Sequence, residues 1–368
     1  MANDATRKTG SSKEAPKETP KETPKETYDD RPFHSEDLPP EVRAPLEPYA
    51  GREPEQPAWF KWAVAQEPER TFVESKGAKI EALTWGERGR QGLLLAHGNS
   101  AHAEWWSFIA PYLAKDYRVT SMSLAGMGNS DWRDTYRFAD FAADAEAVAQ
   151  ATGLHDGPAK AIYIGHSFGG GQVFFTAARY PEQMSAAVLV DTGFGGPPPE
   201  VLEERRKRAE LLANNPSPDR PTRIYPTVAA ALARFRLMPP QPAENHYILD
   251  YIARRSLKTV PFPNGEKGPD GSGEGWTWKF DPNMWEKLDR SDGIMAADRG
   301  AFPELKVPVV HLYGDKSRII ERRASGEPGF LDGRVPEIEI PDSHHHVMID
   351  QPLALVAALR TLLDRWPH

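Results

Sequence analysis

Short apolar segments alternate with longer helical ones through the middle of this chain, and this alternation limits the fold more than any other feature. Four segments read as strands: 92–97, 117–122, 160–164 and 186–190. The first is a continuous apolar run, as expected of a strand buried on both faces. The stretches between them have helical periodicity: 104–113, 138–152 and 168–179. Strands that alternate with helices of about 10 to 15 residues indicate βαβ units and a parallel sheet. Right-handed crossovers then place helices on both faces of that sheet.

Further elements extend the predicted sheet at both ends. Residues 71–75 and 80–85 alternate apolar and polar side chains around Lys76 and Gly77, which is typical of a hairpin. The elements expected late in the chain are two strands and an amphipathic helix: Val307–Leu312, Val335–Ile340 and Leu353–Trp366. We therefore expect an α/β protein with about eight strands, most of them parallel.

Composition divides the chain into a tail, a core in two parts and an insertion. Residues 1–57 carry a Lys-Glu-Thr-Pro repeat and few large apolar groups, so we expect them to be disordered. A solvated spacer is the simplest interpretation of this tail, and a tether or partner-binding arm is the alternative. We expect the core in residues 58–194 and 301–368. Residues 195–300, helix-rich but broken by Pro and Gly, are expected to be a helical cap inserted after the sixth strand.

Charge and composition argue against several classes of function. The net charge of −8 argues against nonspecific nucleic-acid binding, which needs clustered Lys and Arg. The absence of cysteine excludes disulfides, thiolate metal sites and a Cys nucleophile. No apolar run approaches the roughly 20 residues that span a bilayer, and the N-terminal segment lacks the apolar core of a signal peptide. We therefore expect a cytoplasmic protein that binds no membrane, and the oligomeric state is left open.

One tight turn carries a candidate nucleophile. Residues 165–169 read Gly-His-Ser-Phe-Gly and join the strand 160–164 to the helix 168–179. The pattern Gly-x-Ser-x-Gly in this context is typical of a nucleophile elbow, which exposes the serine, here Ser167, at the top of the sheet. The helix that follows directs its free N–H groups at the reacting centre. The alternative is a glycine-rich turn without chemistry.

A serine needs a base that a third group orients, and the candidate bases follow the last predicted strand. Three adjacent histidines, His344, His345 and His346, come after the strand that ends at Ile340. The position fits the chain order Ser, acid, His that such elbows use. A metal site is the alternative, but side chains of sequence neighbours diverge, so we expect neither metal nor cofactor.

These motifs together resemble the capped α/β-hydrolase family over roughly residues 70 to 366. The elbow, the segment 97–100 (His-Gly-Asn-Ser) and the segment 126–130 (Gly-Met-Gly-Asn-Ser) carry the resemblance. In that family the catalytic histidine usually stands seven residues before a Pro that begins the last helix. Counted from Pro352, the resemblance implies His345, with His344 as the second choice.

The resemblance leaves the acid open between two residues. The family usually carries it as Gly-x-x-Asp after the penultimate strand, but here Gly314 leads to Ser317. Some relatives place the acid after the strand that follows the nucleophile helix, and Asp191 occupies that position. Asp191 is therefore the first choice, Asp315 with a shifted loop is the second, and a Ser-His dyad is the third. The acid chiefly fixes the tautomer and orientation of the histidine.

By the same resemblance, the backbone N–H groups of Asn99 and Phe168 form the oxyanion hole, in which losing one donor costs about 3 to 4 kcal/mol. His97 is expected to bond the loop backbone rather than to carry protons. Residues 97–106 and 124–131 are also similar to haloalkane dehalogenases and epoxide hydrolases. Those enzymes need an Asp nucleophile, so Ser167 disfavours both activities.

The sequence thus predicts a serine hydrolase that forms an acyl-enzyme on Ser167 and releases it with water. Apolar side chains of the insertion favour an ester or lactone of a hydrophobic small molecule as substrate. The candidate lining residues are Phe235, Leu237, Met238, Trp276, Trp278, Phe280, Met284 and Trp285. Two alternatives stay open: a C–C bond hydrolase or cofactor-free enzyme acting on aromatic substrates, and a non-catalytic small-molecule receptor.

Overall fold

The structure is a computed structural model, and it describes only part of the chain. The described residues are 38–193, 223–289, 291, 302–324, 326 and 329–366. The chain divides into two compact units, Met1–His34 and Ser35–His368, and every described residue belongs to the second. Residues 1–37 of the predicted tail lie outside the described residues, as do residues 195–222, 290 and 292–300 of the predicted cap.

The last part of the predicted tail belongs to the folded unit. Residues 38–57 contain the short helices α1 (Pro40–Arg43) and η1 (Glu47–Tyr49). Leu46, between them, is only 1% exposed and packs into the hydrophobic core. Large apolar side chains are few and widely spaced in this polar segment, so they give little sequence signal. Burying a leucine nevertheless contributes about 1.5 to 3 kcal/mol. The disorder expected up to residue 57 is therefore corrected for this stretch.

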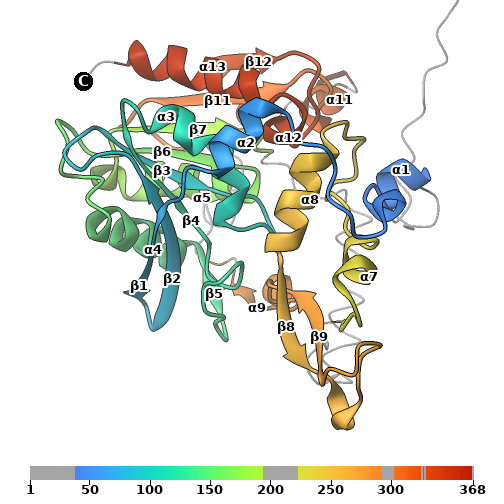
Figure 1. Cartoon of the computed structure of the whole chain (residues 1–368). Helices are drawn as coiled ribbons and strands as arrows, with labels where there is room; N and C mark the ends of the chain where they lie inside the picture. Colours follow the sequence, from blue (N-terminus) through green and yellow to red (C-terminus); the bar gives the residue numbers. More distant parts are fainter. Residues whose placement is uncertain are drawn as a thin grey trace, which may run out of the picture. The chain divides into compact units, whose positions relative to one another are not determined.

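The fold is built on an eight-stranded sheet with the order β1-β2-β4-β3-β6-β7-β11-β12 (Figure 1). β2 pairs antiparallel with β1 and β4, and all other neighbours are parallel. The predicted eight-stranded, mostly parallel sheet is confirmed. The strands are β1 (Glu69–Ser75), β2 (Ala78–Trp85), β3 (Gly92–Ala96), β4 (Arg118–Met122), β6 (Ile162–His166), β7 (Ala186–Val190), β11 (Val309–Gly314) and β12 (Glu337–Ile340).

Helices cover both faces of this sheet, because its parallel strands present apolar side chains alternately to the two sides. In β3, Leu93 and Leu95 join one hydrophobic core and Leu94 joins the other. The first core receives side chains from α2, α3, α8 and α13, and the second from α4 and α5. Their bounds are α2 (Ala58–Val64), α3 (Ala110–Leu113), α4 (Phe138–Ala151), α5 (Phe168–Arg179), α8 (His246–Arg255) and α13 (Pro352–Asp364).

The helix expected over residues 104–113 is divided in the structure. A 3-10 turn, η2 (Ala103–Trp106), precedes the single turn α3, which has Pro111 at its start. Pro111 has no N–H group and its ring excludes a continuous helix through that position. The buried Trp106 and Leu113 nevertheless lie in the same core.

The chain between β7 and β11 is an insertion into the sheet, and its described part mixes helices with strands. β8 and β9 pair antiparallel, with Leu257 opposite Trp278, and they project from the end of α8 (Figure 1). The helical cap expected here thus contains a hairpin whose loop is the Gly- and Pro-rich stretch. The elements are α7 (Val228–Leu232), α8, β8 (Leu257–Pro261), η4 (Pro263–Gly265), β9 (Glu274–Trp278), α9 (Met284–Lys287) and β10 (Leu288–Asp289), which pairs with β5 (Tyr136–Arg137).

The remaining helices are short: η3 (Pro181–Gln183), α11 (Arg318–Ala324) and α12 (Val347–Asp350). Among the described residues, no helix has both the length and the apolar character needed to cross a bilayer.

Candidate active site

Ser167 lies at the turn between β6 and α5, in a backbone conformation that non-glycine residues rarely adopt. Its φ is 51° and its ψ is −115°. The Ser167 N–H donates to the carbonyl of Val190, and the Ser167 carbonyl accepts from the N–H of Gly171, both at 3.0 Å. These bonds hold a strained residue, and such strain is concentrated at functional sites.

The two glycines of the Gly-x-Ser-x-Gly pattern are required by close backbone contacts. A Cβ at Gly165 would lie 2.4 Å from the carbonyl oxygen of Gly169. A Cβ at Gly169 would lie 2.4 Å from the carbonyl oxygen of His97. Because neither contact leaves space for a methyl group, only glycine lets the elbow fold tightly against β3 and the loop that follows it.

Ser167, His345 and Asp191 form a continuous hydrogen-bonded chain. The Nε2 atom of His345 is 2.9 Å from the Oγ of Ser167. The Nδ1 atom of His345 is 2.7 Å from a carboxylate oxygen of Asp191. The loop after β12 carries His345 and the end of β7 carries Asp191. A hydroxyl, an imidazole and a carboxylate in this order can activate the hydroxyl for attack on a carbonyl carbon.

Asp191 is fixed from several sides. Its side chain is 2% exposed, and its second carboxylate oxygen accepts the N–H of Gly314 at 2.9 Å. Its own N–H donates to the carbonyl of Leu312 at 2.7 Å. Both partners belong to β11, so the neighbouring strand orients the acid.

Asp315 and His344, the alternative acid and the alternative base, do not join the hydrogen-bonded chain at Ser167. Asp315 accepts the backbone N–H of Ser343 at 3.0 Å, and no hydrogen bond or ion pair joins it to His345 among the described residues. His344 turns to Asp350, with its Nδ1 3.0 Å from that carboxylate. Ser317, at the usual acid position, caps α11 by accepting the N–H of Ile319.

The predicted oxyanion donors flank Ser167. Phe168 is the first residue of α5, so its N–H has no carbonyl to bond one turn earlier in that helix. Asn99 follows Gly98, where a Cβ would lie 3.4 Å from the Cβ of Ser167. The loop after β3 therefore passes beside the Ser167 side chain.

His97 has the structural role expected of it. Its Nδ1 is 2.7 Å from the carbonyl of Gly98, and its Nε2 accepts the N–H of Leu124 at 3.0 Å. Burial lowers the pKa of His97 to about 3, so the ring is neutral at pH 7 and joins two loops.

Two buried histidines, His166 and His346, lie beside His345; the sequence offers His346 as one of three adjacent candidates but gives no role to His166. His166 precedes Ser167, and its Nε2 bonds the carbonyl of His345 at 3.0 Å. His346 lies with its ring centroid 4.9 Å from that of His345. Burial holds the pKa of both His166 and His346 well below the ordinary value. Among the described residues, His166, His345 and His346 are the side chains whose grouping suits a metal ion.

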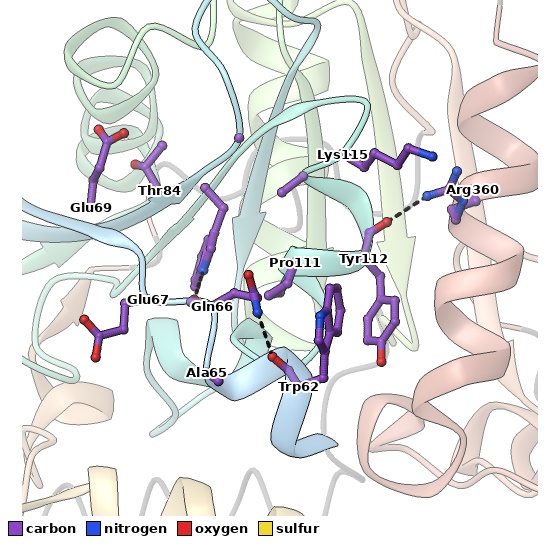
Figure 2. A pocket seen from close by; sticks show the side chains of 13 residues that line it. Trp62, Ala65, Gln66, Glu67, Glu69, Thr84, Pro111, Tyr112, Lys115 and Arg360 are labelled. Carbon is purple, nitrogen blue, oxygen red and sulfur yellow. Dashed lines mark hydrogen bonds between the residues drawn. The ribbon is translucent and has the colours of Figure 1, made fainter. Parts of the chain in front are cut away.

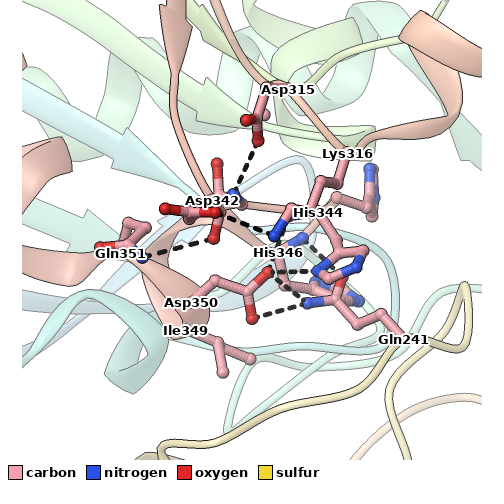
Figure 3. A network of polar contacts seen from close by, with 12 residues as sticks. Gln241, Asp315, Lys316, Asp342, His344, His346, Ile349, Asp350 and Gln351 are labelled. Atoms are coloured by element: carbon pink, nitrogen blue, oxygen red, sulfur yellow. Dashed lines mark hydrogen bonds and ion pairs between the residues drawn. The ribbon is translucent and has the colours of Figure 1, made fainter. Parts of the chain in front are cut away.

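A polar network joins the insertion to the loop that carries His345 (Figure 3). Gln241 donates to both carboxylate oxygens of Asp350 at 3.0 Å and accepts the N–H of His346 at 2.8 Å. Asp350 also accepts the backbone N–H of His344 at 2.7 Å. These contacts fix the backbone on both sides of His345. From the sequence, the six-residue spacing between His344 and Asp350 is only a weak indication that the two residues are in contact. Nothing in the sequence indicates that Gln241 contacts this loop.

The residue that follows the nucleophile in sequence is aromatic and packs against other aromatic side chains. The ring of Phe168 packs edge-on against Phe141 and against Trp285 of the insertion, with centroid distances of 5.8 and 5.5 Å. Trp285 remains 42% exposed. Of the other candidate lining residues, Phe235, Leu237 and Met284 are buried in the packing of the protein, whereas Met238 is exposed.

A separate groove of about 670 Å³ lies between α2, β2, α3 and α13 (Figure 2). Trp62 and Tyr112 pack together there with ring centroids 4.7 Å apart. Neither Ser167 nor His345 lines this groove.

Comparison with known proteins places this fold and elbow in a family. The model of the family described as alpha/beta hydrolase fold matches residues 92–352. The chain belongs to the α/β-hydrolase fold family. The match covers the elbow, the insertion and the loop with His345, and it confirms the fold expected from the motifs.

Individual relatives within the α/β-hydrolase family are distant. The chain is 34% identical to a non-heme chloroperoxidase of Streptomyces lividans over 157 residues, 39% of this chain and 55% of that protein. It spans about half the length of this and other curated relatives, such as a lipase of Mycobacterium tuberculosis, of which it covers 49%. An esterase of the same organism is 24% identical over 77% of this chain and 86% of its own length. The thioesterase domain from the curacin biosynthetic pathway shares the fold, with a TM-score of 0.57, 22% identity and coverage of 80% of this chain and 99% of that domain.

Proposed function

We propose that this chain is a serine hydrolase that cleaves an ester or lactone of a hydrophobic small molecule through an acyl-enzyme on Ser167. The observation that carries the proposal is the hydrogen-bonded chain from the Ser167 hydroxyl through His345 to Asp191. Esterase names among the relatives, including that of Mycobacterium tuberculosis, support the same reaction class.

The first half-reaction transfers the acyl group to the serine. As the Oγ of Ser167 attacks the carbonyl carbon, the Nε2 of His345 takes the hydroxyl proton. Asp191 accepts the Nδ1–H of His345 and stabilises the imidazolium that forms. The proton then passes from His345 to the leaving alcohol, and the acyl-serine remains.

The second half-reaction releases the acid. His345 takes a proton from water, the hydroxide attacks the acyl-serine, and the proton returns to the Oγ of Ser167. In both steps the carbonyl oxygen carries negative charge, which the N–H groups of Asn99 and Phe168 stabilise in this proposal. Phe168 begins α5, and the loop that carries Asn99 passes beside Ser167, which supports these roles. This mechanism needs neither a metal nor a cofactor.

The surroundings of Ser167 favour an apolar acyl or alcohol group. Phe168, next to Ser167 in sequence, contacts the partly exposed Trp285 of the insertion, and apolar groups gain from leaving water at such a surface. We therefore expect nitrophenyl esters of medium-length acyl chains to be cleaved faster than the acetate.

The experiment compares four proteins on nitrophenyl esters and on a fluorophosphonate probe. The wild type should hydrolyse the esters and be labelled once, and Ser167→Ala should lose both properties. Ser272→Ala, in the loop between β8 and β9, is the matched serine control and should keep both. His345→Gln should keep its fold but lose at least about 10³-fold in kcat, as expected when a triad base is removed.

Other outcomes point to the alternatives. A wild type without Ser167-dependent labelling or turnover contradicts the acyl-enzyme, and tight binding of small apolar ligands without turnover then favours a receptor. If product analysis finds a carbon–carbon bond broken while esters are untouched, Ser167, His345 and Asp191 act in a C–C bond hydrolase instead.

A further inference from the structure

Three histidine rings gather beside the nucleophile although they come from two distant segments. His166 ends β6, and His345 and His346 precede α12. The ring centroids of His166 and His345 are 4.9 Å apart, and those of His166 and His346 are 5.4 Å apart. One ring nitrogen from each residue lies within 4.8 Å of those of the other two. We call these three residues the histidine cluster. Their ring nitrogens are arranged nearly as three ligands of one metal ion are.

Buried nitrogens without hydrogen bonds distinguish this cluster from ordinary core packing. The Nδ1 of His166 is buried and makes no hydrogen bond. The ring of His346 interacts with the carbonyls of Met238 and Pro239 but makes no hydrogen bond of standard geometry. The two residues are 1% and 4% exposed. Buried polar groups in proteins almost always have a partner, so the free Nδ1 of His166, beside two further imidazoles, indicates a ligand that the chain itself does not supply.

Two of the rings are also oriented as metal ligands usually are. A ligating histidine commonly donates its second ring N–H to a carboxylate or a backbone carbonyl, which fixes the tautomer and leaves a lone pair for the ion. His166 bonds the carbonyl of His345 through Nε2, which leaves Nδ1 free. His345 bonds Asp191 through Nδ1, which leaves Nε2 facing Ser167.

We propose that His166, His345 and His346 bind a Zn²⁺ ion, and that this ion inhibits the hydrolase. Three imidazoles suit zinc, and with Zn–N bonds of about 2.0 to 2.1 Å they would lie roughly 3.4 Å from one another. The ring nitrogens now lie within 4.8 Å of one another, so the proposal requires the three rings to move closer together when the ion binds. The Asp191 carboxylate behind His345 offsets part of the ion's charge.

Inhibition follows from the single lone pair on the Nε2 of His345. The atom that coordinates zinc cannot accept the proton of Ser167, so zinc binding and acyl transfer exclude each other. The zinc site does not depend on the proposed function, whereas its inhibitory effect rests on it.

The first experiment measures binding directly, in protein without a histidine tag. Equilibrium dialysis against Zn²⁺ should find one tightly bound ion per wild-type chain and at least tenfold weaker binding in His346→Phe. His344→Phe is the matched control, because His344 is the adjacent histidine but points to Asp350, and it should bind zinc as the wild type does. Ser167→Ala should also keep the ion, because serine is not among the three nitrogen ligands.

The second experiment uses the wild type alone, so it does not depend on how a variant folds. Co²⁺ in place of Zn²⁺ should give the intense visible absorption of a tetrahedral site, and Zn²⁺ should lower nitrophenyl ester turnover at least tenfold, with full recovery after a chelator. Equal zinc binding by wild type and His346→Phe, or no tetrahedral cobalt spectrum, overturns the site. Zinc bound with undiminished turnover overturns the inhibition. A chain that cleaves no ester at all contradicts the proposed function and leaves the dialysis result standing.

Discussion

Asp191 accepts hydrogen bonds on both carboxylate oxygens, one from His345 and one from the N–H of Gly314. This arrangement fixes the carboxylate plane and therefore the tautomer of His345, with its proton on Nδ1. Asp315 bonds only the backbone at Ser343 in this region. At the scale of single residues, the two aspartates that the sequence left as alternatives therefore differ in their contacts: Asp191 bonds His345, and Asp315 does not.

Replacing Asp191 with Asn should lower kcat by about 10³- to 10⁴-fold, because the amide stabilises the wrong tautomer of His345 while the geometry is kept. Asp315→Asn, the matched control, should stay within about threefold of the wild type, since only a loop contact changes. Steady-state kinetics on a nitrophenyl ester measure both. Loss of activity in Asp315→Asn alone, in a folded protein, would contradict the assignment.

The elbow shows how much a local pattern can predict. Ser167, the glycines beside it and the helix after it follow from fewer than 20 contiguous residues that form one recognisable pattern. Asp191 follows from its place at the end of a strand. His166 and Gln241 were missed because their contacts with the His345 loop join segments more than 100 residues apart, and no periodicity reports such a contact.

Two neighbouring glycines at the start of α5 should respond in opposite directions to Ala. Gly169→Ala should destabilise the fold by at least about 2 kcal/mol, since its Cβ meets a backbone oxygen. Gly171→Ala should stabilise it by about 0.5 to 1 kcal/mol, because nothing lies within 4 Å of its Cβ and Ala favours helices. Urea unfolding measures both, and equal effects would contradict the close contact at Gly169.

The polar network around Asp350, which joins the insertion to the His345 loop, should also affect turnover. Asp350→Asn replaces an acceptor of three N–H groups with an amide, so the loop should shift and kcat should fall by about 10- to 100-fold. His344→Gln keeps the backbone N–H that Asp350 accepts and should change kcat less than Asp350→Asn does. Similar kcat values for Asp350→Asn and the wild type would mean that this network does not position His345.

At the scale of the whole molecule, buried neutral histidines make the fold sensitive to acid. His102 is 3% exposed and its Nε2 joins the loop after β3 to Ser256, next to α8, at 2.9 Å. Burial lowers its pKa to about 3. An unfolded histidine has a pKa of about 6.5, so between these values the unfolded chain binds a proton that the folded chain does not. Its stabilising effect is complete above about pH 6.5 and is lost as the pH falls toward 3.

The free energy of unfolding should therefore fall by up to about 1.4 kcal/mol per pH unit from His102 alone below pH 6.5. Urea unfolding between pH 8 and pH 4 measures the slope. In His102→Gln, which retains an amide donor for Ser256, the free energy of unfolding should depend less steeply on pH. The difference corresponds to at most one proton fewer taken up on unfolding. An unchanged slope would show that His102 is protonated in the folded protein.

The place of the acid has a consequence for how this protein can change over time. In the proposed mechanism Asp191 supplies the carboxylate from the end of β7, so the turn after β11 contributes a backbone N–H from Gly314 and a helix cap from Ser317, but no reacting group. Beyond Gly314, that turn acts only through the loop that carries His345, because Asp315 and the N–H of Lys316 both bond Ser343. Exchanges of side chains in the turn should therefore be tolerated where these two bonds are kept, whereas an insertion there should move the His345 loop and lower turnover.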